Sequence, residues 1–494
     1  MKALLMYRDH DFDLQPTPRP GEQALIQDLE LNTLFNAMAL DDPFLFDIAK
    51  KAILSGVNND LETIHYRQDI LKDCLENPTA VREIYDIGVE AIAREKKIYS
   101  GVVTYPSSIL RRSIEALQLF VFMLKRLRKM ADEHTARFAS EGFARFFAML
   151  EKELSDSYFD TVQNHLDNLR FRGGVLVSVE LGKGNKGTHY VLRKPDKKQN
   201  WTAWLMGSKS PTYTLSINQR DDAGARTLAE LRNRGINLAA NALAQSADHI
   251  LSFFTLLRTE LAFYIGCLNL HEQVARQGMS TCFPLPVASG EHRHSFRGLY
   301  DVCLALTTKQ NIIGNEMQAD HKKLVIITGA NQGGKSTFLR SIGLSQLMMQ
   351  GGMFVPAESF CANICDGLFT HFKREEDAAM SSGKLDEELR RLSVIVDHVT
   401  PNSLVLFNES LAATNEREGS ELAEQIIRAL VESHIKVFFV THLYEFAHSY
   451  YNRKSGNAIF LRAERHADGE RTFRMIEGEP LETSYGKDLY RRVF

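Results

Sequence analysis

The sequence has few of the residues that mark secreted, zinc-binding or membrane proteins. Its six cysteines are scattered over 494 residues without a CxxC pair or histidines at zinc spacing, which is typical of a reduced cytosolic chain. The opening residues, MKALLMYRDHDFD, reach acidic side chains before a signal-peptide core could form, and no apolar run approaches the length of a membrane span. These absences predict a soluble, cytoplasmic protein with no membrane partner.

The charge composition excludes a general electrostatic attraction to nucleic acid. The formal net charge is −3, so any contact with nucleic acid requires a local basic patch. A chain of 494 residues with 44% hydrophobic content exceeds what one core usually holds, so we expect several domains. We find no internal repeat and no low-complexity segment.

Helical patterns dominate the first third of the chain. The text DLETIHYRQDILKDCLENP places Leu61, Ile64, Ile70 and Leu71 on one stripe that ends at Asn77. A longer amphipathic pattern opens at Pro106, with Ser107 and Ser108 as candidate caps. Its apolar residues recur every three or four positions: Leu110, Ile114, Leu117, Val121, Leu124 and Leu127. This pattern predicts one long helix.

A basic segment interrupts the helices between Arg170 and Arg220. Its alternating text, GVLVSVELGKGNKGTHYVLRKP and SPTYTLSI with glycine-rich turns, predicts an antiparallel β insert. Residues 169–220 contain ten Lys or Arg and two acids, a net charge of 10 − 2 = +8, and both tryptophans, Trp201 and Trp204. Helical text returns from about 224 to 275, and the remainder alternates short strands and helices as an α/β domain does.

The α/β segment contains a phosphate-binding loop pattern in its required context. KLVIITGANQGGKSTFLRS is a β run followed by Gly329, four residues, Gly334 and then helical text. The glycines let successive backbone N–H groups face phosphates, while the Lys335 ammonium reaches the β and γ phosphates and the Ser336 hydroxyl can ligate Mg²⁺. The pattern predicts a site for ATP and Mg²⁺.

A second strand pattern supplies the groups that act on the phosphate. SLVLFNE should lie beside the phosphate loop, with Asn408 at the water shell of the metal and Glu409 at the attacking water as general base. The strand pattern IKVFFVTH then ends at His442, where a γ-phosphate sensor would sit. These residues together predict an ATPase.

With these motifs, the chain resembles the MutS family of ABC-type ATPases. The resemblance rests on ITGANQGGKSTFLR, in which Ala330 and Gln332 replace the usual proline and methionine, and on GLSQLMMQGGMFVPA, FTHFKREEDAAMSSGK, FFVTHLYEF and SYGKDL in family order. IHYRQDILKDCLENP resembles the opening of the MutS core and lever region. The similarity covers nearly the whole chain and is densest in the last third.

The resemblance implies roles for individual residues. It assigns nucleotide binding to the loop residues Gly329, Asn331, Gly333, Gly334, Lys335, Ser336 and Thr337. It makes Asn408 and Glu409 the metal and base pair and His442 the switch histidine. Ser382, Gly383 and Lys384 align with the signature that each subunit inserts against the nucleotide of the other, and the family serine falls at Leu385, so Ser381, Ser382 and Lys384 all stay open as the contact to the trans phosphate. Thr414 and Asn415 occupy the loop that usually crosses the dimer interface.

The same resemblance implies the overall organisation. The fold class is mixed, with a helical core and lever region, a small antiparallel β insert and an α/β P-loop ATPase domain of ABC type. We predict these segments: helical core 1–105, lever helices 106–169, basic clamp-like β insert 170–222, returning lever helices 223–280 and ATPase domain 281–494. Before residue 25 there is no room for the mismatch-reading domain and no Phe-x-Glu, and the family's C-terminal dimerising helices are missing. We therefore expect a homodimer through the ATPase domains that does not recognise mismatches.

Asn408 is the main departure from the family pattern. Its amide can accept a hydrogen bond from a metal-bound water but removes a negative charge, worth at most roughly 4 kcal/mol between unit charges ~4 Å apart at a dielectric of 20. We expect ATP to bind and to be hydrolysed slowly.

The basic insert stands where the MutS clamp interrupts the lever. Its cations, interleaved with Tyr190 and Trp201, are suited to a DNA backbone without base reading: Lys183, Lys186, Arg193, Lys194, Lys197 and Lys198. Structure-selective DNA binding is the favoured interpretation. The alternatives are a solvated hairpin, a ribosome- or RNA-engaging ATPase, and an ATP-gated architectural protein without turnover.

Overall fold

The computed structural model describes residues 1–99, 104–194, 213–218, 220–308, 312–374, 383–466 and 470–481. The chain forms two compact units. Unit 1 consists of residues 1–3, 82–136 and 145–258, and unit 2 of residues 4–81, 137–144 and 259–494. Each unit therefore combines segments that are distant in the sequence. The five consecutive domains predicted from the sequence are a different division of the chain and stay a prediction.

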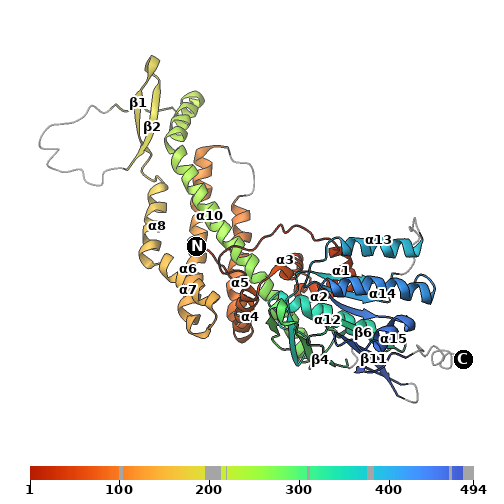
Figure 1. Ribbon diagram of the computed structural model, residues 1–494. Coiled ribbons are helices and arrows are strands. Elements are labelled where there is room, and N and C mark those ends of the chain that lie inside the picture. The colour runs from red at the N-terminus through yellow and green to blue at the C-terminus, as the bar shows by residue number, and fades with distance from the viewer. Residues whose placement is uncertain are drawn as a thin grey trace. The chain divides into compact units, whose positions relative to one another are not determined.

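Long helices make up most of unit 1 (Figure 1). They are α5 (Pro78–Ile98), α6 (Pro106–His134), α7 (Glu141–Glu153), α8 (Asp156–Leu169) and α10 (Asp222–Arg276), of which α5, α7 and α10 also contribute residues to unit 2; a short 3₁₀ turn, η2, spans Thr135–Arg137. The predicted apolar stripe of α6 is buried. The predicted serine cap is wrong, because the cap residue is Tyr105 without a side-chain cap and Pro106 occupies the first turn. Proline at that position has no N–H for a cap to satisfy.

The basic insert contains one antiparallel hairpin. β1 (Leu176–Leu181) pairs with β2 (Gly187–Arg193) around a 3₁₀ turn, η3 (Lys183–Asn185), in which Gly184 has φ 70°. The text SPTYTLSI, residues 210–217, was predicted to form a strand. This prediction is wrong for the described residues 213–217, which form no strand. That segment has no pairing partner among the described residues, and an alternating pattern alone does not form a ladder.

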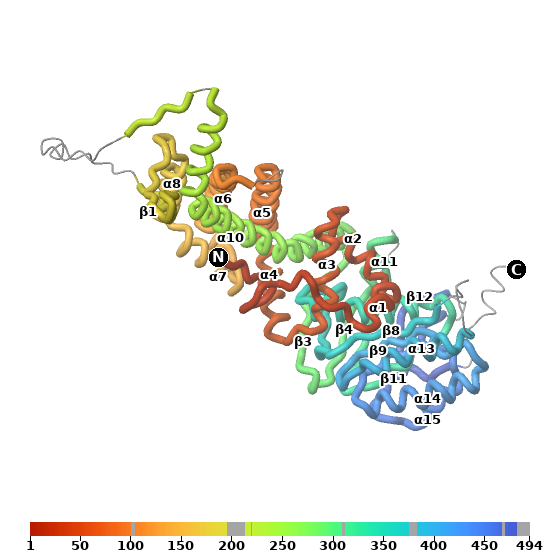
Figure 2. The backbone as a smooth tube through the Cα atoms, turned by 90° about the horizontal axis from the view of Figure 1, so that it is seen from above, coloured from red at the N-terminus to blue at the C-terminus, as the bar shows by residue number. Residues whose placement is uncertain are grey.

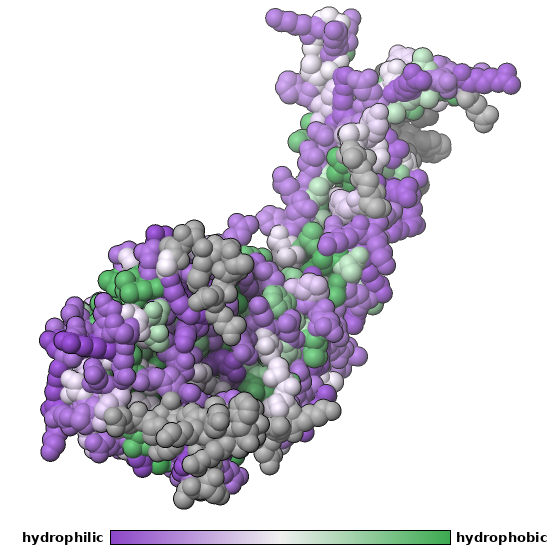
Figure 3. Space-filling model, turned by 90° about the vertical axis from the view of Figure 1, so that its right-hand side faces the viewer, coloured by the Kyte–Doolittle hydropathy of each residue, from purple (hydrophilic) through white to green (hydrophobic). Residues whose placement is uncertain are grey.

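The prediction that no apolar segment approaches the length of a membrane span is wrong for helix α10. By length and composition it is the one described helix that could cross a bilayer, but 67% of its most apolar window is buried within the protein. A buried core helix meets the same criteria. Figure 3 shows a face that is mostly hydrophilic, with apolar side chains in separate patches and no continuous belt.

Two sheets form the centre of unit 2. The larger has the order β12-β11-β6-β10-β9-β8 and is parallel except for the β11–β12 pair; the smaller has the order β3-β7-β4-β5. The strands of the larger sheet are β6 (Leu324–Gly329), β8 (Leu368–Phe372), β9 (Leu404–Asn408), β10 (Lys436–Val440), β11 (Ala458–Arg465) and β12 (Arg471–Glu477). Those of the smaller are β3 (Leu285–Val287), β4 (His294–Leu299), β5 (Asn315–Gln318) and β7 (Ser359–Asn363). A mixed helical and α/β fold is therefore confirmed.

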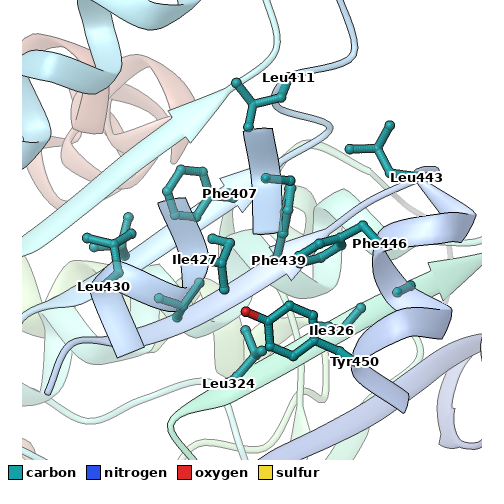
Figure 4. Close-up of a cluster of buried hydrophobic side chains, with 14 of the residues drawn as sticks. Leu324, Ile326, Phe407, Leu411, Ile427, Leu430, Phe439, Leu443, Phe446 and Tyr450 are labelled. Carbon is teal, nitrogen blue, oxygen red and sulfur yellow. The ribbon is translucent and has the colours of Figure 1, made fainter. Parts of the chain in front are cut away.

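Helices cover both faces of the larger sheet. On one face α13 (Lys384–Val396), α14 (Glu416–Glu432) and α15 (Tyr444–Asn452) enclose a core in which Ile427 and Phe446 meet Phe407 and Phe439 (Figure 4). Alternate strand residues point to opposite faces, so Leu406 faces α12 (Lys335–Gln350) instead. A Cβ on Gly343 of α12 would lie 2.8 Å from Leu406, so this glycine permits the close approach of helix and strand.

The N-terminal helices belong to the same unit. They are α1 (Glu22–Asp28), α2 (Leu31–Ala39), α3 (Pro43–Ser55), η1 (Gly56–Asn58) and α4 (Leu61–Glu76); further short helices are η4 (Ser289–Glu291) and α11 (Val302–Thr307). Figure 2 shows α1 beside β8, which is more than 300 residues later in the chain. Leu5 and Met6, before α1, are buried in the same unit, where Tyr264 donates to the carbonyl of Leu5 at 2.5 Å and Arg67 Nε to that of Met6 at 2.9 Å.

Candidate functional site

The loop between β6 and α12 depends on its glycines. Gly329 has φ 111° and Gly334 has φ 86°, a region that side chains disfavour. A Cβ on Gly329 would lie 2.8 Å from the backbone N of Ala463, and one on Gly333 would lie 2.8 Å from Ala463 Cβ. Strand β11 therefore supports the loop so closely that glycine is required at these positions.

Lys335 begins α12 and is folded back over this loop. Its Nζ donates to the carbonyl oxygens of Gly329 at 3.1 Å and Ala330 at 3.0 Å, and only 5% of the residue is exposed. Burial lowers the pKa of Lys335, the Glu409 carboxylate opposes that shift, and the Arg471 guanidinium adds to it. The ammonium is thus held by weak neutral acceptors that an anionic ligand could replace.

Ser336 of α12 and Asn408 of β9 meet at one edge of the larger sheet. Strand β10 lies between β6 and β9, so β9, the strand predicted beside the glycine loop, is not the neighbour of β6. The parallel strands end at one edge, where the first turn of α12 crosses toward β9. There Ser336 Oγ donates to Asn408 Oδ1 at 3.0 Å. A hydroxyl and an amide oxygen are hard ligands of the kind that Mg²⁺ and its bound waters accept.

Glu409 and His442 form a second polar pair at the same edge. Glu409 follows β9 with φ 52° and donates its N–H to the carbonyl of Val440 at 2.8 Å. Its Oε1 lies 2.9 Å from His442 Nε2. The hydrogen bond to His442 lowers the pKa of the Glu409 carboxyl, against a smaller opposing effect of burial. The structure therefore places the predicted sensor histidine against the predicted base.

A cavity of about 380 Å³ opens over the loop. Its lining includes the predicted residues Asn331, Gly333, Gly334, Lys335, Ser336, Thr337 and Glu409. Apolar walls come from Ile312, Ile313 and Phe473. Asn408 lines a neighbouring cavity of about 550 Å³ that shares Ser336 and Thr337. A larger cavity of about 790 Å³, lined in part by the four-stranded sheet, contains none of the predicted residues.

Sequence reasoning missed three residues of this site. Arg471 of β12 donates through Nε to the carbonyl of Asn331 at 2.7 Å. Phe473 has φ 59° and is 49% exposed at the cavity wall. Asn315 anchors it, donating to its carbonyl at 3.2 Å and accepting from the N–H of Met475 at 2.7 Å. No local motif marks them, because only the β11–β12 pairing brings residues 471–475 to a loop 140 residues earlier.

The predicted interface residues lie around two helix starts. Gly383 precedes α13 and is exposed, and Lys384 is the first helical residue. Among the described residues, no atom would lie within 4 Å of a Cβ at Gly383. Ser382 lies outside the described residues. Asn415 accepts from the N–H of Glu418 at 3.0 Å and thus caps α14, a structural role that the sequence analysis did not foresee.

The predicted nucleic-acid residues belong to unit 1. Lys183, Lys186, Arg193 and Lys194 are all exposed on the β1–β2 hairpin or directly after it. Lys197 and Lys198 lie outside the described residues, as do Trp201 and Trp204. The hairpin also exposes Leu176, Val179, Leu181 and Val191. On its other side Val177 and Tyr190 lie against Gly235 and Arg234 of α10, so the exposed side of the hairpin is the one suited to contact a partner.

Two family models match successive parts of this chain. A family model described as MutS2 N-terminal domain matches residues 59–277, and one described as MutS domain V matches residues 325–491. The DNA mismatch repair protein MutS of Leuconostoc citreum is 29% identical over 243 residues, 48% of this chain and 28% of that protein.

Two further relatives of the same name match shorter segments. That of Thermus aquaticus is 32% identical over 181 residues, 37% of this chain and 22% of that protein. That of Thermotoga maritima is 36% identical over 137 residues, 28% of this chain and 17% of that protein. The matches thus span less than a third of the length of these curated relatives.

Proposed function

Because the chain belongs to the MutS family, we propose that it is a DNA-binding ATPase that acts as an ATP-switched dimeric clamp on DNA structures, and not as a reader of mismatched bases. One observation carries the proposal: Lys335, the Ser336–Asn408 pair and the Glu409–His442 pair converge at one edge of the sheet, around the glycine loop. Such a clamp would work in the cytoplasm.

The residues present fit ATP and Mg²⁺. The glycine loop and Lys335 would receive the phosphates, with Lys335 exchanging its carbonyl acceptors for phosphate oxygens. Ile312, Ile313 and Phe473 form an apolar wall suited to the base. Ser336 and, through water, Asn408 would hold Mg²⁺, which neutralises charge on the phosphate oxygens when bound.

Glu409 is the proposed general base. It lines the cavity and remains ionised at neutral pH, because the His442 hydrogen bond lowers its pKa. A carboxylate held by a neighbouring imidazole can orient a water and accept its proton. His442 thereby acts as a positioning residue for Glu409, in addition to its predicted place near the γ-phosphate.

Slow turnover is proposed because Asn408 carries no charge. The amide accepts from Ser336 as a carboxylate would, but it attracts a divalent ion less strongly. This feature also favours the second candidate, an ATP-gated architectural protein without turnover. Phosphate release after mixing enzyme with excess MgATP separates the two: release at a rate that Glu409→Gln abolishes supports the ATPase, and no release supports the second candidate.

A homodimer with shared sites is proposed from the open side of the cavity. The N-terminus of α13 at Gly383, with Lys384, is suited to an anion supplied by a second subunit. Mixing Lys335→Ala and Gly383→Asp subunits should restore activity that neither variant has alone. Within the described part of its own subunit, nothing would lie within 4 Å of a Cβ at position 383. No rescue in a mixture where mixed dimers are demonstrated would contradict the shared site.

The hairpin is the proposed DNA contact. Replacing Lys183, Lys186 and Lys194 by Gln should weaken binding about equally for all sequences and reduce its salt dependence, because backbone contacts act through counterion release. The matched control is Lys129→Gln, an exposed cation of α6 in the same unit. Duplex, mismatched, branched and single-stranded DNA, structured RNA and ribosomes should be compared with and without ATP. Preference for RNA or ribosomes would favour the RNA-engaging alternative.

A further inference from the structure

Basic side chains gather at one corner of unit 2, where strands β6 and β10 begin. The group comprises His292, His321, Lys323, His434 and Lys436, and we call it the basic corner. Lys323 Nζ lies 3.0 Å from His434 Nδ1, and the N–H of His321 donates to the carbonyl of His292 at 2.7 Å. The β6–β10 pairing brings Lys436 to the same place, since the N–H of Val437 donates to the carbonyl of Lys323 at 2.8 Å. After burial, the charges of the other four side chains lower the pKa of His292.

The corner has few acids to balance this charge. The segments 291–294, 320–323 and 434–436 contain four Lys or Arg and two acids, a net charge of 4 − 2 = +2 before any histidine is protonated, in a chain of net charge −3. Asp320 is already engaged, since it accepts from the N–H of His294 at 2.8 Å and lies 3.6 Å from Arg293 Nε. The other acid, Glu291, is exposed. Like charges gathered without partners repel unless an anion joins them.

Two nitrogens at this corner also need a partner. Lys436 Nζ and His294 Nε2 are buried, and nothing in the described part of the chain hydrogen-bonds to either. The burial lowers the pKa of Lys436 to about 7, and burial together with Lys436 lowers the pKa of His294 well below its usual value. Buried polar atoms in native proteins nearly always have a partner. Lys436 therefore adds positive charge to the corner, partly opposed by Asp320, without being itself open to solvent.

We propose that the basic corner binds a phosphate group, supplied either by a nucleic-acid backbone or by a free oligophosphate. The corner is distinct from the candidate nucleotide site, because it lies at the amino ends of β6 and β10, whereas the glycine loop lies at the carboxyl ends. It is also distinct from the hairpin, which belongs to unit 1. The inference does not depend on the proposed ATPase activity.

Binding should be stronger at acidic pH. Lys436 gains charge as the pH falls through about 7, and His292 gains charge at a lower pH than an ordinary histidine, because burial and the neighbouring charges lower its pKa. The other charged groups of the packed segments are Arg293 on the β4 side, Asp320 and Lys322 before β6, and the exposed Glu291. Lys322 is bonded to the carbonyl of Gly456 at 2.7 Å. The expected pH dependence therefore rests on Lys436 and His292.

The test uses the full chain labelled with ¹³C at the histidine rings. The signals of His292, His321 and His434 are assigned by single His→Gln variants and followed by NMR during titration with inorganic phosphate at about pH 6 and pH 8. They should shift at the lower pH in both the wild type and Lys335→Ala, which separates this site from the nucleotide site. The double variant Lys323→Gln, His434→Gln should weaken binding by at least about tenfold, the loss expected for one charge-assisted hydrogen bond.

Matched controls and separate ligands complete the experiment. His398→Gln, which replaces an exposed histidine at the end of α13, should leave phosphate binding unchanged. Tripolyphosphate and a single-stranded oligonucleotide distinguish the two sources of the phosphate by which of them shifts the corner signals at lower concentration. The proposal is overturned if neither phosphate, tripolyphosphate nor oligonucleotide shifts these signals, or if the double variant, with an unchanged melting temperature, binds phosphate as the wild type does.

Discussion

Placing a carboxylate at position 408 should lower the Mg²⁺ requirement of the proposed ATPase. Asn408→Asp changes one side-chain group and little else, because Asp can still accept the hydrogen bond that Ser336 Oγ donates at 3.0 Å. The backbone of the position is held separately, since its carbonyl accepts from the N–H of Lys373 at 2.9 Å. The substitution therefore tests the charge and leaves the geometry in place.

The size of the expected effect follows from the distance assumed between a carboxylate at position 408 and a bound Mg²⁺. Two unit charges ~4 Å apart at an effective dielectric of 20 interact by roughly 4 kcal/mol, which is an upper bound. The position is partly exposed, and solvent and the triphosphate recover much of that energy. If about 1.4 kcal/mol remains, the Mg²⁺ concentration for half-maximal turnover falls about tenfold.

The assay is phosphate release as a function of Mg²⁺ at saturating ATP, with wild type and variant compared at equal ionic strength. Asn452→Asp on α15 is the matched control, because it makes the same charge change at an exposed residue away from the loop. An unchanged Mg²⁺ requirement would refute the reasoning that Asn408 faces the metal. Loss of turnover with normal ATP binding would show instead that the site is tuned around the amide.

Three further substitutions test the site and its support. Glu409→Gln should keep ATP binding and stop turnover, with accumulation of an ATP-bound dimer in light scattering; surviving turnover would place the base elsewhere. Arg471→Gln should weaken ATP affinity about tenfold through the lost bond to Asn331 and raise the pKa of Lys335, whereas Arg474→Gln on the same strand is the control; equal ATP affinity in both would exclude a positioning role for Arg471. Burial raises the pKa of Glu260 to about 7, so the wild type should lose about 3 kcal/mol of stability as the pH rises from about 4.5 to 7, and Glu260→Gln should remove this pH dependence; a difference in stability between variant and wild type that stays constant from pH 4 to pH 8 in thermal melting would contradict the linkage.

The candidate site was predictable where its chemistry is local in the chain. The glycine loop, Lys335 and Ser336 follow one another within eight residues, so their spacing alone indicates a loop that can surround phosphates. Asn408, Glu409 and His442 were found because they lie at or just after the ends of buried strands, and parallel strands end at one edge of a sheet. The α6 stripe and the β1–β2 hairpin were likewise visible as periods of 3.6 and 2.

Long-range pairing decided the rest. Strand β10 lies between β6 and β9, an order that no local pattern specifies, and the β11–β12 hairpin brings Arg471 and Phe473 to the loop. The packing of α1 beside β8 and the gathering of three short segments into the basic corner also depend on the folded core. By itself, the sequence determined the kinds of elements and the chemistry at their ends, because propensity and spacing act over neighbouring residues. Which elements became neighbours was decided only by tertiary packing, because burial of apolar surface depends on the whole fold and not on chain order.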